Sequence, residues 1–162
     1  MSGYISGLLA MLAINTIIAY SVFVPASAGL LNLGAAGFVL VGAYSAGALT
    51  ALWDAPLWMA VPLGALMAGL VAFLIAFPIL RTRGIYMVLA TFAFAEVVGG
   101  VLINIPALGG AAGLSVMAYA GLPVVAPVAV LVVCFVAWLM ATRFGLSVRA
   151  VHDDENVAPL FG

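Results

Sequence analysis

The residues that could support acid–base, nucleophilic or metal chemistry in this chain are few and scattered. There are four arginines, five carboxylates and a single histidine, His152. A metal site needs several ligands close together, but no Cys or second His lies near His152. The sequence also lacks a Ser-His-Asp pattern and an HExxH motif. We therefore predict that the chain is not an enzyme and that it holds no metal or other cofactor.

Glu96 is the one ionisable residue in the middle of an apolar segment, within "TFAFAEVVGG". A charge at membrane depth costs at least about 2.5 kcal/mol, so such a residue normally faces protein or water. Two interpretations follow: a residue on a transport path, or a structural carboxyl bonded to a neighbouring helix. A proton relay is not predicted, because no other ionisable residue lies within the apolar segments.

The elements that position these residues are membrane helices. The chain is 68% hydrophobic and 6% charged, whereas soluble domains carry about 25% charged residues. No soluble globule of this length could bury so much apolar surface. The absence of a basic face argues against nucleic-acid binding, and the absence of a polar stripe argues against a peripheral anchor.

A membrane-spanning helix needs about 20 apolar residues, and five segments satisfy that length. They are roughly 4–24, 34–52, 57–80, 85–105 and 123–142, with Pro, Gly or charged residues between them. We predict an all-α, polytopic transmembrane helical bundle. The first segment is expected to be retained rather than cleaved as a signal peptide, because no Lys or Arg precedes it.

The arginines predict the orientation in the membrane. Arg81 and Arg83 precede two segments, and Arg143 and Arg149 follow them, so two crossings bring all four to one face. The positive-inside rule makes that face cytoplasmic. If all five segments cross, the N-terminus is outside; a broken or re-entrant second segment would invert this orientation.

The second segment is unusually rich in glycine, in "SAGLLNLGAAGFVLVGAY". Glycine costs close to 1 kcal/mol relative to alanine inside a helix, so we expect a helix that starts or breaks within the membrane. Small residues also allow close helix packing, and we favour packing for the part from Gly34 to Gly47. The candidates for a path or for helix packing are Asn32, Gly34, Gly37, Glu96 and Asn104. "PALGGAAGLS" (106–115) is expected to form an outside loop or a short re-entrant turn.

Residues 143–162 hold five of the nine charges. A charge cluster is usually a solvated tail. Here, however, the charges are interleaved with apolar residues, among them Val148, Val151, Val157, Leu160 and Phe161. A purely solvated tail has little need of them, so the segment is expected to dock on a partner.

Four stretches, taken in order along the chain, carry a family resemblance. They are "SAGLLNLGAAGFVLVGAYSAG", "LRTRGIYMVLATFAFAEVV", "LGGAAGLS" and "TRFGLSVRAVHDDENVAPLFG". Together they resemble the inner-membrane permeases of ATP-binding-cassette (ABC) importers for branched-chain amino acids, and the M-type (LivM-like) subunits more than the H-type. The last stretch is similar to the cytoplasmic loop by which such permeases engage their ATPases.

The resemblance implies a multi-pass protein of the bacterial inner membrane. Its expected partners are cytoplasmic ABC ATPases, a second permease subunit and a periplasmic substrate-binding protein. Arg149, Asp153, Asp154, Glu155 and Gly162 match the coupling loop. Residues 1–162 would form a single permease domain, with 143–162 as its coupling segment. Because family members continue with further spans, the chain is expected to be an N-terminal portion.

Two departures from the family pattern stand out. Pro159 lies where the family continues a helix, so the coupling helix is expected to end near Ala158 or to turn at Pro159. Leu108 and Ala112 replace residues that are often polar. The alternatives are a related importer for urea or short amides, which shares these landmarks, and a membrane scaffold subunit that transports nothing.

Overall fold

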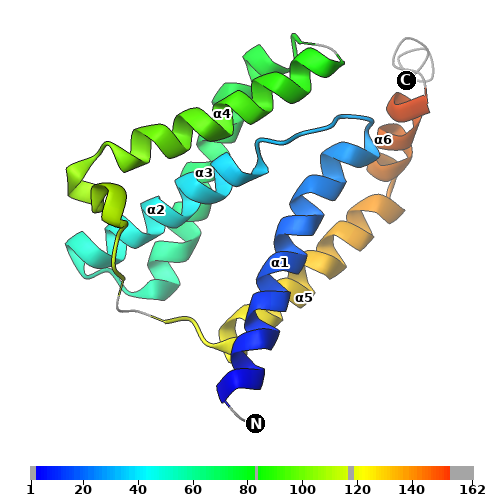
Figure 1. The fold of residues 1–162 in the computed structure, drawn as a ribbon. Helices are drawn as coiled ribbons and strands as arrows, with labels where there is room; N and C mark the ends of the chain where they lie inside the picture. Colours follow the sequence, from blue (N-terminus) through cyan, green and yellow to red (C-terminus); the bar gives the residue numbers. More distant parts are fainter. Residues whose placement is uncertain (1–2, 83, 117–118, 154–162) are drawn as a thin grey trace. The chain divides into compact units, whose positions relative to one another are not determined.

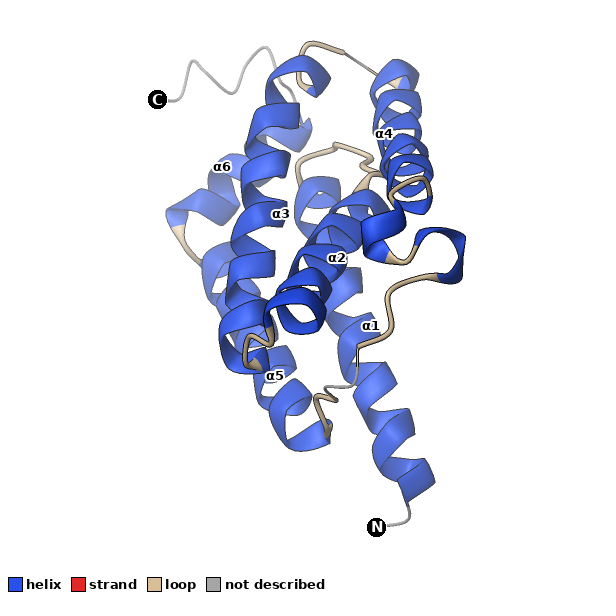
Figure 2. Cartoon of the chain, turned by 90° about the vertical axis from the view of Figure 1, so that its left-hand side faces the viewer, coloured by secondary structure: helices blue, strands red, loops and turns tan. Residues whose placement is uncertain are grey.

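The computed structural model describes residues 3–82, 84–116 and 119–153. In chain order the helices are α1 (Gly3–Ser27), α2 (Ala35–Trp53), α3 (Leu57–Ile79), α4 (Ile85–Ile103), the short 3-10 helices η1 (Pro106–Leu108) and η2 (Gly110–Ala112), α5 (Leu122–Ala141) and α6 (Arg143–Asp153). Every regular element of these ranges is helical (Figure 2). Helices α1 to α5 are long and apolar enough to cross a membrane. The prediction of an all-α bundle with five apolar segments is confirmed.

The five long helices expose most of their large apolar side chains. Only 6–11% of the residues in each apolar window are buried within the chain, and the buried apolar residues are mostly alanines, such as Ala13, Ala60 and Ala129. In water such a surface would aggregate. A helix that is apolar all round suits a membrane, where lipid or other helices cover its outer faces.

Two boundaries differ from the sequence-based predictions. The first helix was expected to end at Pro25, but α1 continues through it to Ser27. The N–H groups of Ala28 and Leu30 both donate to the Pro25 carbonyl, at 3.0 and 3.1 Å, so this last turn is closed by the chain that follows. The second segment was expected to start or break within the membrane. Helix α2 begins within the glycine-rich stretch and is continuous from Ala35 to Trp53, so it does not break. Its glycines are tolerated because they lie against neighbouring helices, as described below.

The chain divides into two compact units. The first contains α1, α5 and α6. Here α1 and α5 pack in parallel (Figure 1): Leu9 and Ala13 lie along the same groove as Leu122 and Ala126. At the other end of the pair, the Ser27 hydroxyl lies 3.9 Å from the Met140 sulfur.

The parallel packing of α1 and α5 constrains the membrane topology. If both helices cross the membrane in the same direction, the chain between them must cross it an odd number of times. Crossings by α2, α3 and α4 satisfy this condition. A re-entrant α2 followed by two crossings does not, so the packing favours the arrangement in which all five long helices cross.

The second unit, residues 32–119, is organised around α2. Helix α3 packs antiparallel to it, with Gly42 facing Ala68 and Ala46 facing Gly64. A Cβ on Gly64 would lie only 2.6 Å from the Gly42 carbonyl oxygen, so the two backbones meet because neither residue has a side chain. Gly42 thus lies at a close helix contact, and a packing role for the part from Gly34 to Gly47 stays a prediction. By contrast, a Cβ on Gly3 or Gly7 would meet nothing within 4 Å.

The connection after α4 folds back onto α2. It consists of η1 and η2, and Gly109, Gly110 and Gly113 have positive φ angles. A Cβ on Gly47 would lie 3.0 Å from Leu114 Cδ2 and 3.4 Å from Val116 Cγ2. Leu114 and Val116 thus lie against α2 at Gly47. At the usual helical rise, Gly47 is about 9 Å from the end of α2 at Trp53. The expectation that 106–115 forms an outside loop or a short re-entrant turn stays a prediction.

Candidate functional site

The predicted site residues belong to the two units separately. Asn32, Gly34, Gly37, Glu96 and Asn104 lie in the α2–α4 unit, whereas Arg149 and Asp153 lie on α6 in the other. Asp154, Glu155 and Gly162, together with the helix end predicted near Ala158 and Pro159, lie outside the described residues. The two groups are therefore described in turn.

The start of α2 is a short polar turn held against α4. The Asn32 side-chain oxygen accepts a hydrogen bond from the Gly34 N–H at 2.7 Å. The next backbone donor, the N–H of Leu33, reaches across to Thr91 Oγ1 at 3.1 Å. These bonds satisfy the backbone donors of Leu33, just before α2, and of Gly34, its N-cap residue. The sequence placed a helix start in this region, and the side chains of Asn32 and Thr91 define it.

Thr91 is the residue of this cluster that sequence reasoning missed. It is 1% exposed, and its hydroxyl donates to the Val88 carbonyl at 2.9 Å while accepting from Leu33. Met87, Thr91 and Ala95 are the buried residues of α4 and recur every four positions, which places them on one helix face. The available signal was Thr91 as the one polar residue within "MVLATFAFA" (87–95), four positions from Met87 and from Ala95.

Gly34 and Gly37 form the contact surface of α2 toward α4. A Cβ on Gly34 would lie 3.2 Å from the Thr91 carbonyl oxygen, and one on Gly37 would lie 2.8 Å from the Phe94 ring and 3.0 Å from Ala95 Cα. Further along, Gly99 faces Leu40, so α2 and α4 run in parallel. Of the predicted candidates, Asn32, Gly34 and Gly37 are thus brought together by α4.

Glu96 and Asn104 do not join that cluster. Glu96 is exposed on α4, and no hydrogen bond links its carboxyl to another residue of the described ranges. Asn104 follows α4, where its amide donates back to the Gly100 carbonyl at 2.7 Å. Asn104 lies thirteen positions after Thr91, about 20 Å along the helix axis. It therefore closes its own helix end and does not meet Asn32.

Helix α6 follows α5 directly and is the amphipathic helix among the described elements. Its Gly145 lies against the Met140 carbonyl so closely that a Cβ would overlap it, so the chain turns sharply between the two helices. His152 packs over Gly29, where a Cβ would lie 2.8 Å from the imidazole Nδ1. Arg149 lines a groove between α1 and α5. Asp153 is the last residue of α6.

The comparison with known proteins decides the family. A family model described as "Branched-chain amino acid transport system / permease component" matches residues 4–162. The chain belongs to this permease family. The predicted resemblance is thereby confirmed.

Two relatives of this permease family match part of the chain. The "High-affinity branched-chain amino acid transport system permease protein LivM" of Escherichia coli K12 is 41% identical over 76 residues. The protein of the same name from Salmonella typhimurium LT2 is 40% identical over 76 residues. Each match covers 47% of this chain and 18% of the relative, so the chain spans less than a fifth of these relatives in the aligned region. No solved structure gives a significant match.

Family membership and the five apolar helices support a multi-pass membrane protein. The structure also shows how the helices around α2 pack. Around α2, the permease chain builds a tightly packed small-residue centre with one buried hydroxyl, and it leaves Glu96 on an exposed face. The Glu96 carboxyl is thus exposed on α4, outside the packed centre.

Proposed function

We propose that this chain forms part of the membrane path of an ABC importer for branched-chain or related amino acids. The protein would lie in the bacterial inner membrane and work with a second permease subunit, cytoplasmic ATPases and a periplasmic substrate-binding protein. The observation that carries the proposal is the match of the permease family model to residues 4–162. The five apolar helices supply the membrane-spanning part that such a path needs.

The α2–α4 unit would be the fixed wall of the path. Gly34 and Gly37 are proposed to serve packing, because both lie against α4 with no room for a side chain. Asn32 would hold the start of α2 through its bond to Gly34. Glu96 is the better candidate for the path or for a contact with the second subunit, because an exposed carboxyl within a membrane helix needs water or another polar partner. Asn104 would close α4 near the mouth of the path.

Residues 143–162 would couple the chain to an ATPase. Helix α6 exposes Phe144, Leu146 and Val151, which could grip an apolar groove on a partner. Asp153, Asp154 and Glu155 would add charge, and charged contacts mainly set orientation and specificity. Gly162 completes the set expected from the family resemblance. Arg149 belongs to the same segment, and its coupling role stays a prediction that competes with the one argued in the next subsection.

The orientation is part of the proposal. Arg143 and Arg149 follow α5, so the positive-inside rule puts this end in the cytoplasm, where an ATPase could reach α6. Because α1 is parallel to α5, the start of α1 would then lie on the periplasmic side. This agrees with the orientation expected from the sequence.

Co-purification with the ATPase tests the coupling. Val151→Asp removes apolar grip and Glu155→Lys reverses a charge, so each should reduce the ATPase recovered with the membrane chain. Arg81→Gln is the matched control, since it removes a charge proposed to lie on the same membrane face but outside the segment. Equal ATPase recovery with all three variants, at equal membrane insertion, would count against coupling through 143–162.

The substrate class needs its own measurement. The importer should take up labelled leucine, isoleucine or valine when the complete permease is present with its binding protein. Uptake of urea or a short amide with no leucine uptake would favour the related importer. Assembly with the ATPase without any solute uptake would favour a scaffold.

A further inference from the structure

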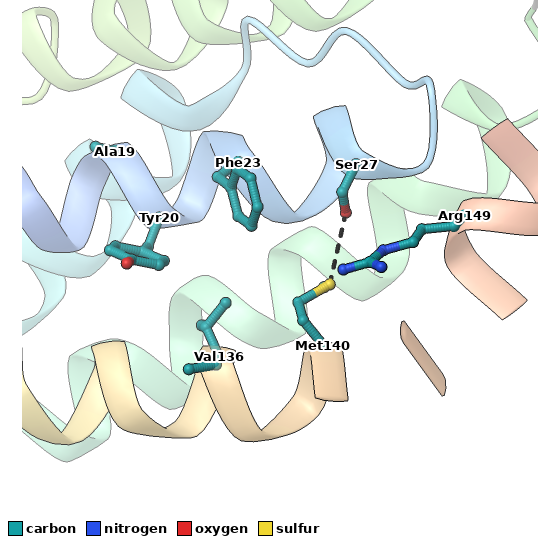
Figure 3. Close-up of a pocket in the computed structure, with 8 residues that line it drawn as sticks. Ala19, Tyr20, Phe23, Ser27, Val136, Met140 and Arg149 are labelled. Atoms are coloured by element: carbon teal, nitrogen blue, oxygen red, sulfur yellow. Dashed lines mark hydrogen bonds between the residues drawn. The ribbon is translucent and has the colours of Figure 1, made fainter. Parts of the chain in front are cut away.

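An open groove of about 550 Å³ runs between α1 and α5, near the end where both helices finish. We name it the α1–α5 groove. Its lining consists of Ala19, Tyr20, Phe23 and Ser27 of α1, Val136, Ala137 and Met140 of α5, and Arg149 of α6. Figure 3 shows the apolar side chains along its length and the Arg149 guanidinium at one end. The volume lies within the range of about 300–1,000 Å³ that is usual for ligand sites.

Arg149 reaches this groove because α6 folds back at the end of α5. The turn at Gly145, against the Met140 carbonyl, allows that reversal. The guanidinium then points toward Ser27 and Met140 (Figure 3). The Ser27 hydroxyl is already committed to the Val24 carbonyl at 2.7 Å. Arg149 is therefore the group at this end that can offer a planar fork of N–H donors to an anion.

Aromatic and basic residues near this end of the groove are those expected at the depth of lipid headgroups. Trp138 is 63% exposed on the last turns of α5, and Tyr20 lines the groove on α1. Aromatic residues with a polar edge collect at the membrane–water interface. Arg143 begins α6 immediately beyond. By the positive-inside rule this end faces the cytoplasmic leaflet, which carries anionic lipids.

We propose that the α1–α5 groove binds one anionic phospholipid of the cytoplasmic leaflet. Its phosphate would pair with Arg149, and an acyl chain would lie along Phe23, Val136 and Ala137. Charge complementarity selects this occupant: an apolar helix would fill the groove but leave a cation at its end, whereas a phospholipid offers both an anion and a hydrocarbon chain. The proposed coupling to an ATPase rests instead on Phe144, Leu146 and Val151 and on the residues after α6. Arg149 is the residue for which the two roles compete.

Lipid retention by the purified full chain tests the proposal. The chain is exposed to an equimolar mixture of phosphatidylglycerol and phosphatidylcholine, and bound lipid is measured by native mass spectrometry. The wild type should retain phosphatidylglycerol in preference. Arg149→Gln should lower that retention about fivefold, the effect of one arginine near an anionic lipid. Arg143→Gln removes a charge from the same helix but does not line the groove, and should retain lipid like the wild type.

A second pair of variants tests the apolar part of the site. Ala137→Phe fills the groove and should reduce retention of both lipids, whereas Ala141→Phe adds the same ring outside the lining and should not. The wild type alone gives a further check that needs no substitution: phosphatidylglycerol should raise its melting temperature more than phosphatidylcholine, because a ligand of the folded state stabilises it.

Three outcomes would overturn the proposal. One is equal retention of phosphatidylglycerol by Arg149→Gln and Arg143→Gln. Another is equal stabilisation of the wild type by the two lipids. The third is a change of oligomeric mass in Ala137→Phe with lipid retention intact, which would make the groove a protein interface. None of these results depends on whether the ATPase co-purifies, so failure of the lipid site and failure of the proposed function can be told apart.

Discussion

Replacing Gly64 by alanine tests the central packing contact of the α2–α4 unit. A Cβ at this position would lie 2.6 Å from the Gly42 carbonyl oxygen, 2.9 Å from Ala46 Cβ and 3.1 Å from the Ala46 backbone nitrogen. Two of the three neighbours are backbone atoms, so no side chain can rotate away to make room. To bring the oxygen to an ordinary contact of 3.4 Å, the helices must separate locally by about 0.8 Å.

That separation has a definite energetic cost. A radial gap of about 0.5–1 Å loses a quarter to a half of the dispersion attraction between the atoms that were in contact, and overpacking in a close-packed interior costs about 1–3 kcal/mol. Alanine has a higher helix propensity than glycine by up to about 1 kcal/mol, which acts in the opposite direction. We therefore expect Gly64→Ala to lower the free energy of unfolding by about 0–2 kcal/mol relative to the wild type.

Gly69→Ala is the matched control on the same helix. A Cβ there would meet nothing within 4 Å, so this variant gains helix propensity with no steric cost. The difference between the two variants isolates packing and should be about 1–3 kcal/mol in favour of Gly69→Ala. The assay is reversible unfolding of the chain in mixed micelles as the denaturing detergent is raised. Equal unfolding free energies for Gly64→Ala and Gly69→Ala would refute the close approach of α2 and α3.

Three further substitutions probe other contacts. Thr91→Val removes the acceptor of the Leu33 N–H and should lower the free energy of unfolding by about 0.6–1.7 kcal/mol, the range for hydrogen bonds between membrane helices. The Leu33 amide should then exchange with deuterium faster, and Thr91→Ser should restore its protection. Unchanged exchange in Thr91→Val would contradict the bond. Gly29→Ala places an alanine at a φ of +78° beside His152 and should lower the free energy of unfolding by about 1–2 kcal/mol. Adding His152→Ala removes the clash with the imidazole and should recover only that part of the loss. Full recovery would rule out backbone strain at Gly29. Glu96→Gln should change the unfolding free energy of the isolated chain by less than about 0.5 kcal/mol, because the side chain is exposed; a larger loss would support the structural interpretation of this carboxyl.

The spans and their order could be read from the sequence because membrane insertion depends on the length of an apolar run. The predicted ranges 34–52 and 85–105 agree with α2 and α4 to within two residues at each end. The ends are marked by residues whose physical effect is local, such as Asp54 in the left-handed region after α2 and Pro56 before α3. The helix end predicted at Pro25 was wrong, because a proline near the last turn does not have to end a helix. Here the chain that follows donates hydrogen bonds to the Pro25 carbonyl.

The candidate site was only partly accessible to the same reasoning. The density of glycine indicated that α2 packs closely, but not that Gly42 meets Gly64 while Gly34 and Gly37 meet α4. Asn32 was singled out, whereas Thr91, its counterpart on α4, was not. Asn104 and Glu96 were named with Asn32 as candidates for a path or for helix packing. In the structure Asn104 bonds to Gly100 at the end of α4, and Glu96 is exposed on that helix.

The sequence by itself determined that the chain is a membrane protein of five apolar helices in this permease family, since composition, run length and four ordered motifs are local properties. Only the tertiary structure decided which faces meet, that α1 and α5 run in parallel, and that Arg149 turns back to the α1–α5 groove. The reason is that these helices are apolar on every side. Lipid solvates an apolar face about as well as another helix does, so hydrophobic periodicity carries no signal for the packed side. That side is chosen by close backbone approach and by single polar groups such as Thr91, whose partners lie far away in the sequence.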